Sequence, residues 1–194
     1  MKVKTLFLIC FLSITCLLNA ADKPVIQIHT DNSSLIFRVA DNGRLYQSYL
    51  GKKLSHETDI SHLPQGTEAY ITHGMEDYFE PAIHILHNDG NPSLLLKYVS
   101  HETKAVSQGV NETIITLGGD KYPVTVKLHY VTYPAEDIIK TYTEISHKEK
   151  KPVVLHQYAS SMLHLNRAKY YLTEFAGDWA HEANISDQPL EFGK

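Results

Sequence analysis

Histidines and carboxylates are the side chains of this 194-residue sequence whose types could carry chemistry, and there are twelve histidines. His84 and His87 lie three positions apart, which points them to opposite faces of a strand. His156 and His164 share a face but lie far apart along it. No HExxH or comparable metal-binding pattern occurs. We therefore expect scattered histidines of the surface or core, and neither a metal nor a cofactor.

The adjacent carboxylates Glu76 and Asp77 are the obvious acidic pair. Two carboxylates that cleave a glycosidic bond must flank it, about 5–5.5 Å apart for retention and about 6.5–9.5 Å apart for inversion. Neighbours in an extended segment project oppositely, so one of them can contact a ligand but the two do not form an acid/base dyad. The alternative is a solvated acidic turn. Nucleophile motifs such as GxSxG are missing too, so no catalytic residue is predicted.

Alternating apolar residues, as in 124–130, are typical of half-buried strands, and helical periodicity is almost absent. The turn Asp41-Asn42-Gly43 favours a tight primed hairpin, because Asn-Gly tolerates positive φ. The stretch 52–66 is irregular, and 180–194 leaves the strand pattern. The fold class is all-β, with two large stacked antiparallel sheets. The predicted strands are 25–30, 34–40, 44–51, 67–72, 82–88, 93–106, 111–118, 123–133, 137–148, 152–165 and 169–176.

The first 20 residues read as a secretory signal peptide, with Lys2 and Lys4 before an apolar run and cleavage expected after Ala20. A lipid anchor at Cys16 is the alternative. Because Cys10 and Cys16 both precede the cleavage site, disulfides are excluded from the exported chain. No later stretch is long enough to span a membrane, so we expect a soluble protein, periplasmic or extracellular.

Charge and composition narrow the partners further. The formal net charge is −4, with acidic and basic residues interspersed, so no basic stripe is available for nucleic acid. Twelve tyrosines suit both sheet packing, which we favour, and contacts with sugars. No repeat or linker divides the chain, which predicts one domain over residues 21–194.

Three pairs of segments, in the same order and with the same spacing, resemble the N-terminal domain of family-36 glycoside hydrolases, the α-galactosidases. The first pair, LPQGTEAY and GMEDYFEPA, is similar to the family's LPQEYP and GxxDFRxPA. The second is similar to its D(V/I)I and TEI signature, and the third to its SS(M/A)L and YYLTxFxGxWA run. The segments are 63–70 with 74–82, 96–101 with 137–145, and 158–163 with 171–180.

The resemblance implies a large antiparallel supersandwich of the galactose-mutarotase-like type. In the family a (β/α)8 barrel and a small C-terminal β domain follow it. The enzymes release terminal α-linked galactose from oligosaccharides with retention, using a nucleophile in a K-(W/Y)-D-x-N motif of the barrel. That motif is absent here. We therefore expect the non-catalytic N-terminal domain of an exported α-galactosidase, cut at the junction with the barrel.

The same resemblance implies three substrate-binding residues, Asp77, Tyr70 and Trp179, beside the sugar pocket of the parent enzyme. Phe79 stands where the family has an arginine, which removes a bidentate contact to a sugar hydroxyl. Trp179 is alternatively a core residue. The implied partners are α-galactoside oligosaccharides, bound through the parent enzyme, and further copies of the chain in a homo-oligomer.

Two other functions remain open on the sequence. One is a free-standing carbohydrate-binding sandwich without an enzyme partner, since fold alone does not set function. It would need an exposed aromatic platform, for which Tyr70, Tyr78 and Phe79 are the candidates. The other is a structural interaction domain without any ligand.

Overall fold

The computed structural model describes residues 23–75, 80–165 and 170–190. One sheet has four antiparallel strands in chain order. They are β1 (Val25–His29), β2 (Ser33–Val39), β3 (Leu45–Lys52) and β4 (Thr67–Glu68). The short helix α1 (Glu57–Ser61) follows β3, inside a stretch that we predicted to be irregular.

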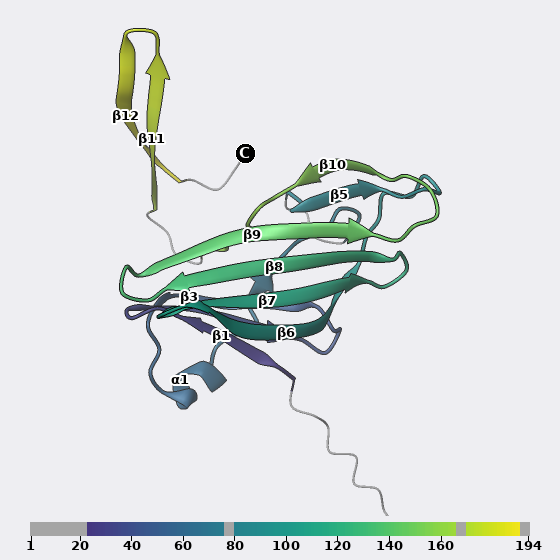
Figure 1. The fold of residues 1–194 in the computed structure, drawn as a ribbon, viewed down its shortest axis with the longest axis horizontal. Helices are drawn as coiled ribbons and strands as arrows, with labels where there is room; N and C mark the ends of the chain where they lie inside the picture. The colour runs from purple at the N-terminus through teal and green to yellow at the C-terminus, as the bar shows by residue number, and fades with distance from the viewer. Residues whose placement is uncertain (1–22, 76–79, 166–169, 191–194) are drawn as a thin grey trace, which may run out of the picture.

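The other large sheet is also antiparallel and lies in front of the first in Figure 1. Its strands are β6 (Leu96–Ser107), β7 (Val110–Gly119), β8 (Val124–Tyr133) and β9 (Ile138–His147). Two further antiparallel pairs complete the described fold. They are β5 (Ile83–Leu86) with β10 (Val154–Tyr158), and β11 (Tyr171–Asp178) with β12 (His181–Pro189). The predicted all-β, two-sheet class is confirmed.

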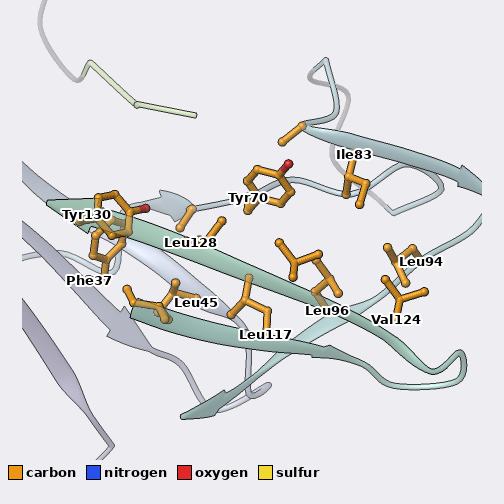
Figure 2. Close-up of a cluster of buried hydrophobic side chains, with 14 of the residues drawn as sticks. Phe37, Leu45, Tyr70, Ile83, Leu94, Leu96, Leu117, Val124, Leu128 and Tyr130 are labelled. Atoms are coloured by element: carbon orange, nitrogen blue, oxygen red, sulfur yellow. The ribbon is translucent and has the colours of Figure 1, made fainter. Parts of the chain in front are cut away.

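The hydrophobic core lies between the two large sheets. In β8, residues 124, 126, 128 and 130 all point into this core, as alternation requires, and they meet side chains such as Phe37 from β2. The Phe37 and Tyr130 rings lie 5.1 Å apart, centroid to centroid (Figure 2). Each such large side chain contributes about 1.5–3 kcal/mol when it is fully removed from water.

The β2–β3 connection confirms the predicted hairpin but corrects its turn type. Gly43 has a φ of +77°, and its N–H donates to the Ala40 carbonyl over 2.9 Å. Ala40 in turn donates to the Arg44 carbonyl over 3.0 Å, which makes a three-residue loop with one left-handed glycine. A two-residue primed turn would need positive φ at Asn42 as well, and Asn42 does not have it.

Asp137, the first residue of the family-like D-I-I segment, links the two large sheets through hydrogen bonds. It has a φ of +57°, in the β8–β9 turn. Its carboxylate accepts hydrogen bonds from the hydroxyls of Thr30, in the β1–β2 turn of the opposite sheet, and of Ser33, the first residue of β2. These bonds hold the pKa of Asp137 below its usual value. The residue therefore fastens the two sheets together at one end.

Two predictions near the C-terminus are wrong. The strand predicted over 152–165 stops at Tyr158, because the backbone after it bonds to other elements: Ala159 donates to the Ala82 carbonyl, and His164 to the Gln47 side chain. The segment after Ala180 is strand β12, not irregular chain. All of its residues are exposed, so no buried face imposes an apolar alternation that the sequence could reveal.

Candidate functional site

The loop 74–81 is the candidate site that the sequence suggested, and its two ends are closed by backbone hydrogen bonds. His73 donates to the Ile83 carbonyl over 3.0 Å, and Ala82 donates to the Ile71 carbonyl over 2.8 Å. The amide of Gln157, on β10, donates to the Pro81 carbonyl over 2.8 Å. These bonds fix the base of the loop. Its central part, 76–79, with the predicted ligand contact Asp77, lies outside the described residues.

Gly74 begins this loop at a position where no other residue fits. Its φ is +83°, in the region that favours glycine. A Cβ added there would lie 2.4 Å from Ser93 Oγ and 2.8 Å from Ser93 Cα, so side chain and backbone both exclude it. The close approach seats the loop base against the segment that leads into β6.

Tyr70 is a core residue in this structure rather than a surface one. It is 2 % exposed, and its hydroxyl donates to the Ala159 carbonyl over 2.8 Å. Its ring lies among the apolar side chains of the core (Figure 2). Burial raises the pKa of the hydroxyl. Tyr70 therefore ties the segment after β10 to the loop base, and its contact with a sugar in a longer enzyme stays a prediction.

Three histidine rings form a row at the loop base, which the sequence did not reveal. His73 and His84 stack with centroids 3.8 Å apart, and His156 lies 4.9 Å from His84. Burial, followed by the neighbouring imidazoles, lowers the pKa of His84. The three residues come from distant segments with no common spacing, so a sequence pattern could not bring them together.

The stacked geometry does not suit a metal ion. The lone pairs of an imidazole lie in the plane of its ring, so two rings that face each other do not direct them at one point. Among the described residues, no group of three or more histidines, cysteines or carboxylates is arranged to hold a metal. The row instead concentrates weakly basic groups beside the loop.

A second polar cluster centres on Glu112, in β7. The carboxylate is 6 % exposed and accepts hydrogen bonds from the Tyr142 hydroxyl at 2.5 Å and from His129 Nδ1 at 2.9 Å. Lys104 Nζ lies 3.0 Å from its other oxygen. These contacts, with Tyr142 contributing most, lower the pKa of Glu112 to about 2. The group is therefore ionised at neutral pH, with three donors around it.

Trp179 lies in the turn between β11 and β12, and 92 % of its surface is exposed. Trp179 is therefore not a core residue of this chain, which was the alternative to a place beside the sugar pocket. The hairpin that carries it stands away from the two sheets (Figure 1). Of the three predicted site residues, the structure places Tyr70 in the core and Trp179 on an exposed hairpin, and Asp77 lies outside the described residues.

Within those described residues, no helix is long and apolar enough to cross a membrane. The predicted signal peptide occupies residues that the structure does not describe.

Comparison with known proteins gives a consistent result. Residues 38–194 match the family model described as "Glycosyl hydrolase family 36 N-terminal domain". No curated protein matches the chain. Among solved structures, the α-galactosidase from Lactobacillus brevis has a TM-score of 0.75 at 19 % identity, over 87 % of this chain and 28 % of that one.

Two further structures are at least as similar. The galactosidase domain of the α-galactosidase-sucrose kinase AgaSK gives a TM-score of 0.78 at 20 % identity, over 87 % of this chain and 28 % of that chain. The α-galactosidase AgaA variant from Geobacillus stearothermophilus, in complex with raffinose, gives 0.79 at 19 % identity, over 88 % and 28 %.

At these identities the structural likeness shows the fold. This chain spans about 28 % of the length of those three solved chains. The sandwich described above is the part that they share. Because the family model covers most of the sequence, the chain belongs to the glycosyl hydrolase family 36 N-terminal domains.

Proposed function

We propose that this chain is the non-catalytic N-terminal β-sandwich of an exported α-galactosidase, whose full-length form hydrolyses terminal α-galactosyl residues of oligosaccharides. The family match over residues 38–194 is the observation that carries the proposal. Neighbours with the same fold include AgaA variants in complex with raffinose and with stachyose. Both ligands are α-galactosides, which is the substrate class proposed for the parent enzyme.

The distribution of exposed apolar side chains supports a role in docking. Of the large hydrophobic residues exposed in the described chain, all except Val99 and Val106 lie between residues 138 and 190. They include Tyr171 and Phe175, each 68 % exposed, on β11. Several exposed apolar side chains on one hairpin are typical of an interface. We assign the part of this surface on β11 and β12 to contact with the catalytic barrel and with further copies of the chain.

Turnover assays test whether hydrolysis requires the sequence beyond this domain. The purified chain should not hydrolyse p-nitrophenyl α-galactoside, whereas a polypeptide that adds the in-frame sequence beyond Lys194 should do so. That added sequence should contain a K-W-D-x-N segment. Hydrolysis by the chain alone would contradict the proposal, as would the absence of such a segment from the extended reading frame.

Export and assembly need separate measurements. N-terminal sequencing of the protein recovered outside the cytoplasm should begin at Ala21. Light scattering of the extended polypeptide should give a homo-oligomer, and of the chain alone a tendency to associate. A chain recovered with an intact Met1 end, or a strictly monomeric enzyme, would contradict these parts of the proposal.

A further inference from the structure

A groove of about 490 Å³ crosses the outer face of the β6–β9 sheet, the face opposite the one that covers the core. This sheet faces the viewer in Figure 1, with the β1–β4 sheet behind it. The volume lies within the range of small-molecule sites, about 300–1,000 Å³. Its lining residues are Val106, Glu112, Val131, Tyr133, Lys140 and Tyr142.

Strand register places these side chains on one face. Glu112 pairs with Val131 across β7 and β8, and Val131 pairs with Lys140 across β8 and β9. Tyr133 follows Val131 by two positions and Tyr142 follows Lys140 by two, so both share that face. The groove therefore has Glu112 and Val131, which are almost fully buried, at its floor and more exposed side chains above them.

Glu112 is a preorganised acceptor at this floor. The Tyr142 hydroxyl and His129 Nδ1 both donate to Oε1, and Lys104 lies 3.0 Å from Oε2. Side chains already locked by such bonds need not be ordered when a ligand arrives, which reduces the cost of binding. Among the described residues, Lys104 is the one group that contacts Oε2, so this oxygen retains a lone pair for a further donor.

Each lining group meets one part of a sugar. Tyrosine rings and valine side chains pack on the apolar C–H face of a pyranose, a carboxylate accepts bonds from its hydroxyl groups, and an ammonium group donates to them. An anionic ligand is disfavoured by the carboxylate at the floor, and a fully apolar one would leave that carboxylate desolvated. Acceptor, donor and apolar walls together fit a neutral polyhydroxylated ligand.

We infer that this groove binds a neutral saccharide of one or two sugar units. The site lies on the β6–β9 sheet, whereas the loop 74–81 follows the β1–β4 sheet. Its lining includes none of the substrate-binding residues predicted from the sequence, Asp77, Tyr70 and Trp179. It goes beyond the proposed function, because a domain with no catalytic role would itself hold sugar. A shallow, open groove predicts weak affinity, with a Kd of about 1 mM, or −4 kcal/mol.

The test is a titration of the ¹⁵N-labelled full chain with raffinose, followed by amide chemical shifts. Shifts should be confined to the parts of β6, β7, β8 and β9 around the groove. Lys140→Ala and Tyr133→Ala should each weaken binding about tenfold, because each removes one direct contact worth about 1.4 kcal/mol. Lys127→Ala is the matched control: it is a half-exposed lysine on the same sheet, not part of the groove lining, and should leave binding unchanged.

Three results would overturn the inference. They are no shift at any raffinose concentration, shifts centred on another surface, or equal weakening by the Lys127 control. Competition by sodium sulfate would identify an anion site and would also reject it. None of these results bears on hydrolysis by the extended polypeptide, so failure of the groove is distinguishable from failure of the proposed function.

Discussion

Replacing Glu112 by glutamine should destabilise the chain at neutral pH and alter its response to acid. The substitution keeps the size of the side chain but removes its negative charge. The Tyr142 hydroxyl and His129 Nδ1 then lose their charged acceptor, although both remain in the same packed environment. The loss of a charged partner from a buried hydrogen-bonded group is among the costlier single changes.

The magnitude follows from the pKa. A fall from 4.5 to about 2 corresponds to about 3 kcal/mol, at 1.36 kcal/mol for each pH unit. Part of this comes from Lys104, whose side chain is 54 % exposed, and water screens that part. We therefore expect Glu112→Gln to lower the free energy of unfolding by about 2 kcal/mol at pH 7.

The pH dependence has a definite sign. Because the pKa of Glu112 is lower in the folded chain, its ionised form stabilises that state at pH values above 4.5. The contribution disappears as pH falls from 4.5 towards 2. The difference in unfolding free energy between the wild type and Glu112→Gln should therefore shrink by more than half between pH 7 and pH 3.

Urea denaturation at pH 7, 4 and 3, followed by circular dichroism, measures this difference. Glu144→Gln is the matched control, since this glutamate is 57 % exposed on the same sheet and should matter by less than about 0.5 kcal/mol. A Glu112→Gln variant as stable as the wild type at pH 7 would refute the reasoning. So would a difference that stays constant with pH.

Three further outcomes are expected. Gly74→Ala should lower the free energy of unfolding by about 2 kcal/mol or more, measured with urea. Gly90→Ala should lower it by about 1 kcal/mol, because Gly90 has the same φ of +83° but open space around it. Equal losses would contradict the close packing at Gly74. His84 has a lowered pKa, so stability should fall as pH drops below 6.5, and less so in His84→Gln; identical pH profiles would contradict this. Trp179→Ala should change the unfolding free energy by less than about 0.5 kcal/mol, whereas a core tryptophan would cost about 3–5 kcal/mol.

The sequence predicted the fold where a strand has one buried face. In β8, alternate residues face the core, so the pattern and the observed strand agree within one residue. It failed where burial does not govern the backbone. In β12 no residue is buried, and in 159–165 single hydrogen bonds to Ala82 and Gln47 replace a strand ladder. A period-two pattern of apolar residues arises from burial of one strand face, so it predicts neither β12 nor the end of the strand at Tyr158.

The candidate site was less predictable because its parts meet only after folding. Tyr70 was assigned to a sugar pocket by family resemblance, yet its hydroxyl is bonded to the Ala159 carbonyl inside the core. The rings of His73 and His84 stack, and that of His156 lies tilted beside His84, so three separate segments meet here. Glu112 lies seventeen positions from His129 and thirty from Tyr142, and only the β7–β8–β9 register brings them together. The spacing of neighbouring residues in the sequence therefore does not predict these contacts.

Burial of apolar side chains stabilises strands β1 to β8 but not the hairpin of β11 and β12. Strands β1 to β8 enclose nearly all of the buried core, whereas β11 and β12 expose every residue and contact mainly each other. An isolated two-stranded hairpin is marginally stable in water, so the docking proposed above would stabilise this one. Its apolar side chains would each gain about 1.5–3 kcal/mol when covered. Under the proposed docking, the hydrogen-exchange protection of the hairpin should rise when the catalytic barrel covers it, so this protection tests the proposal.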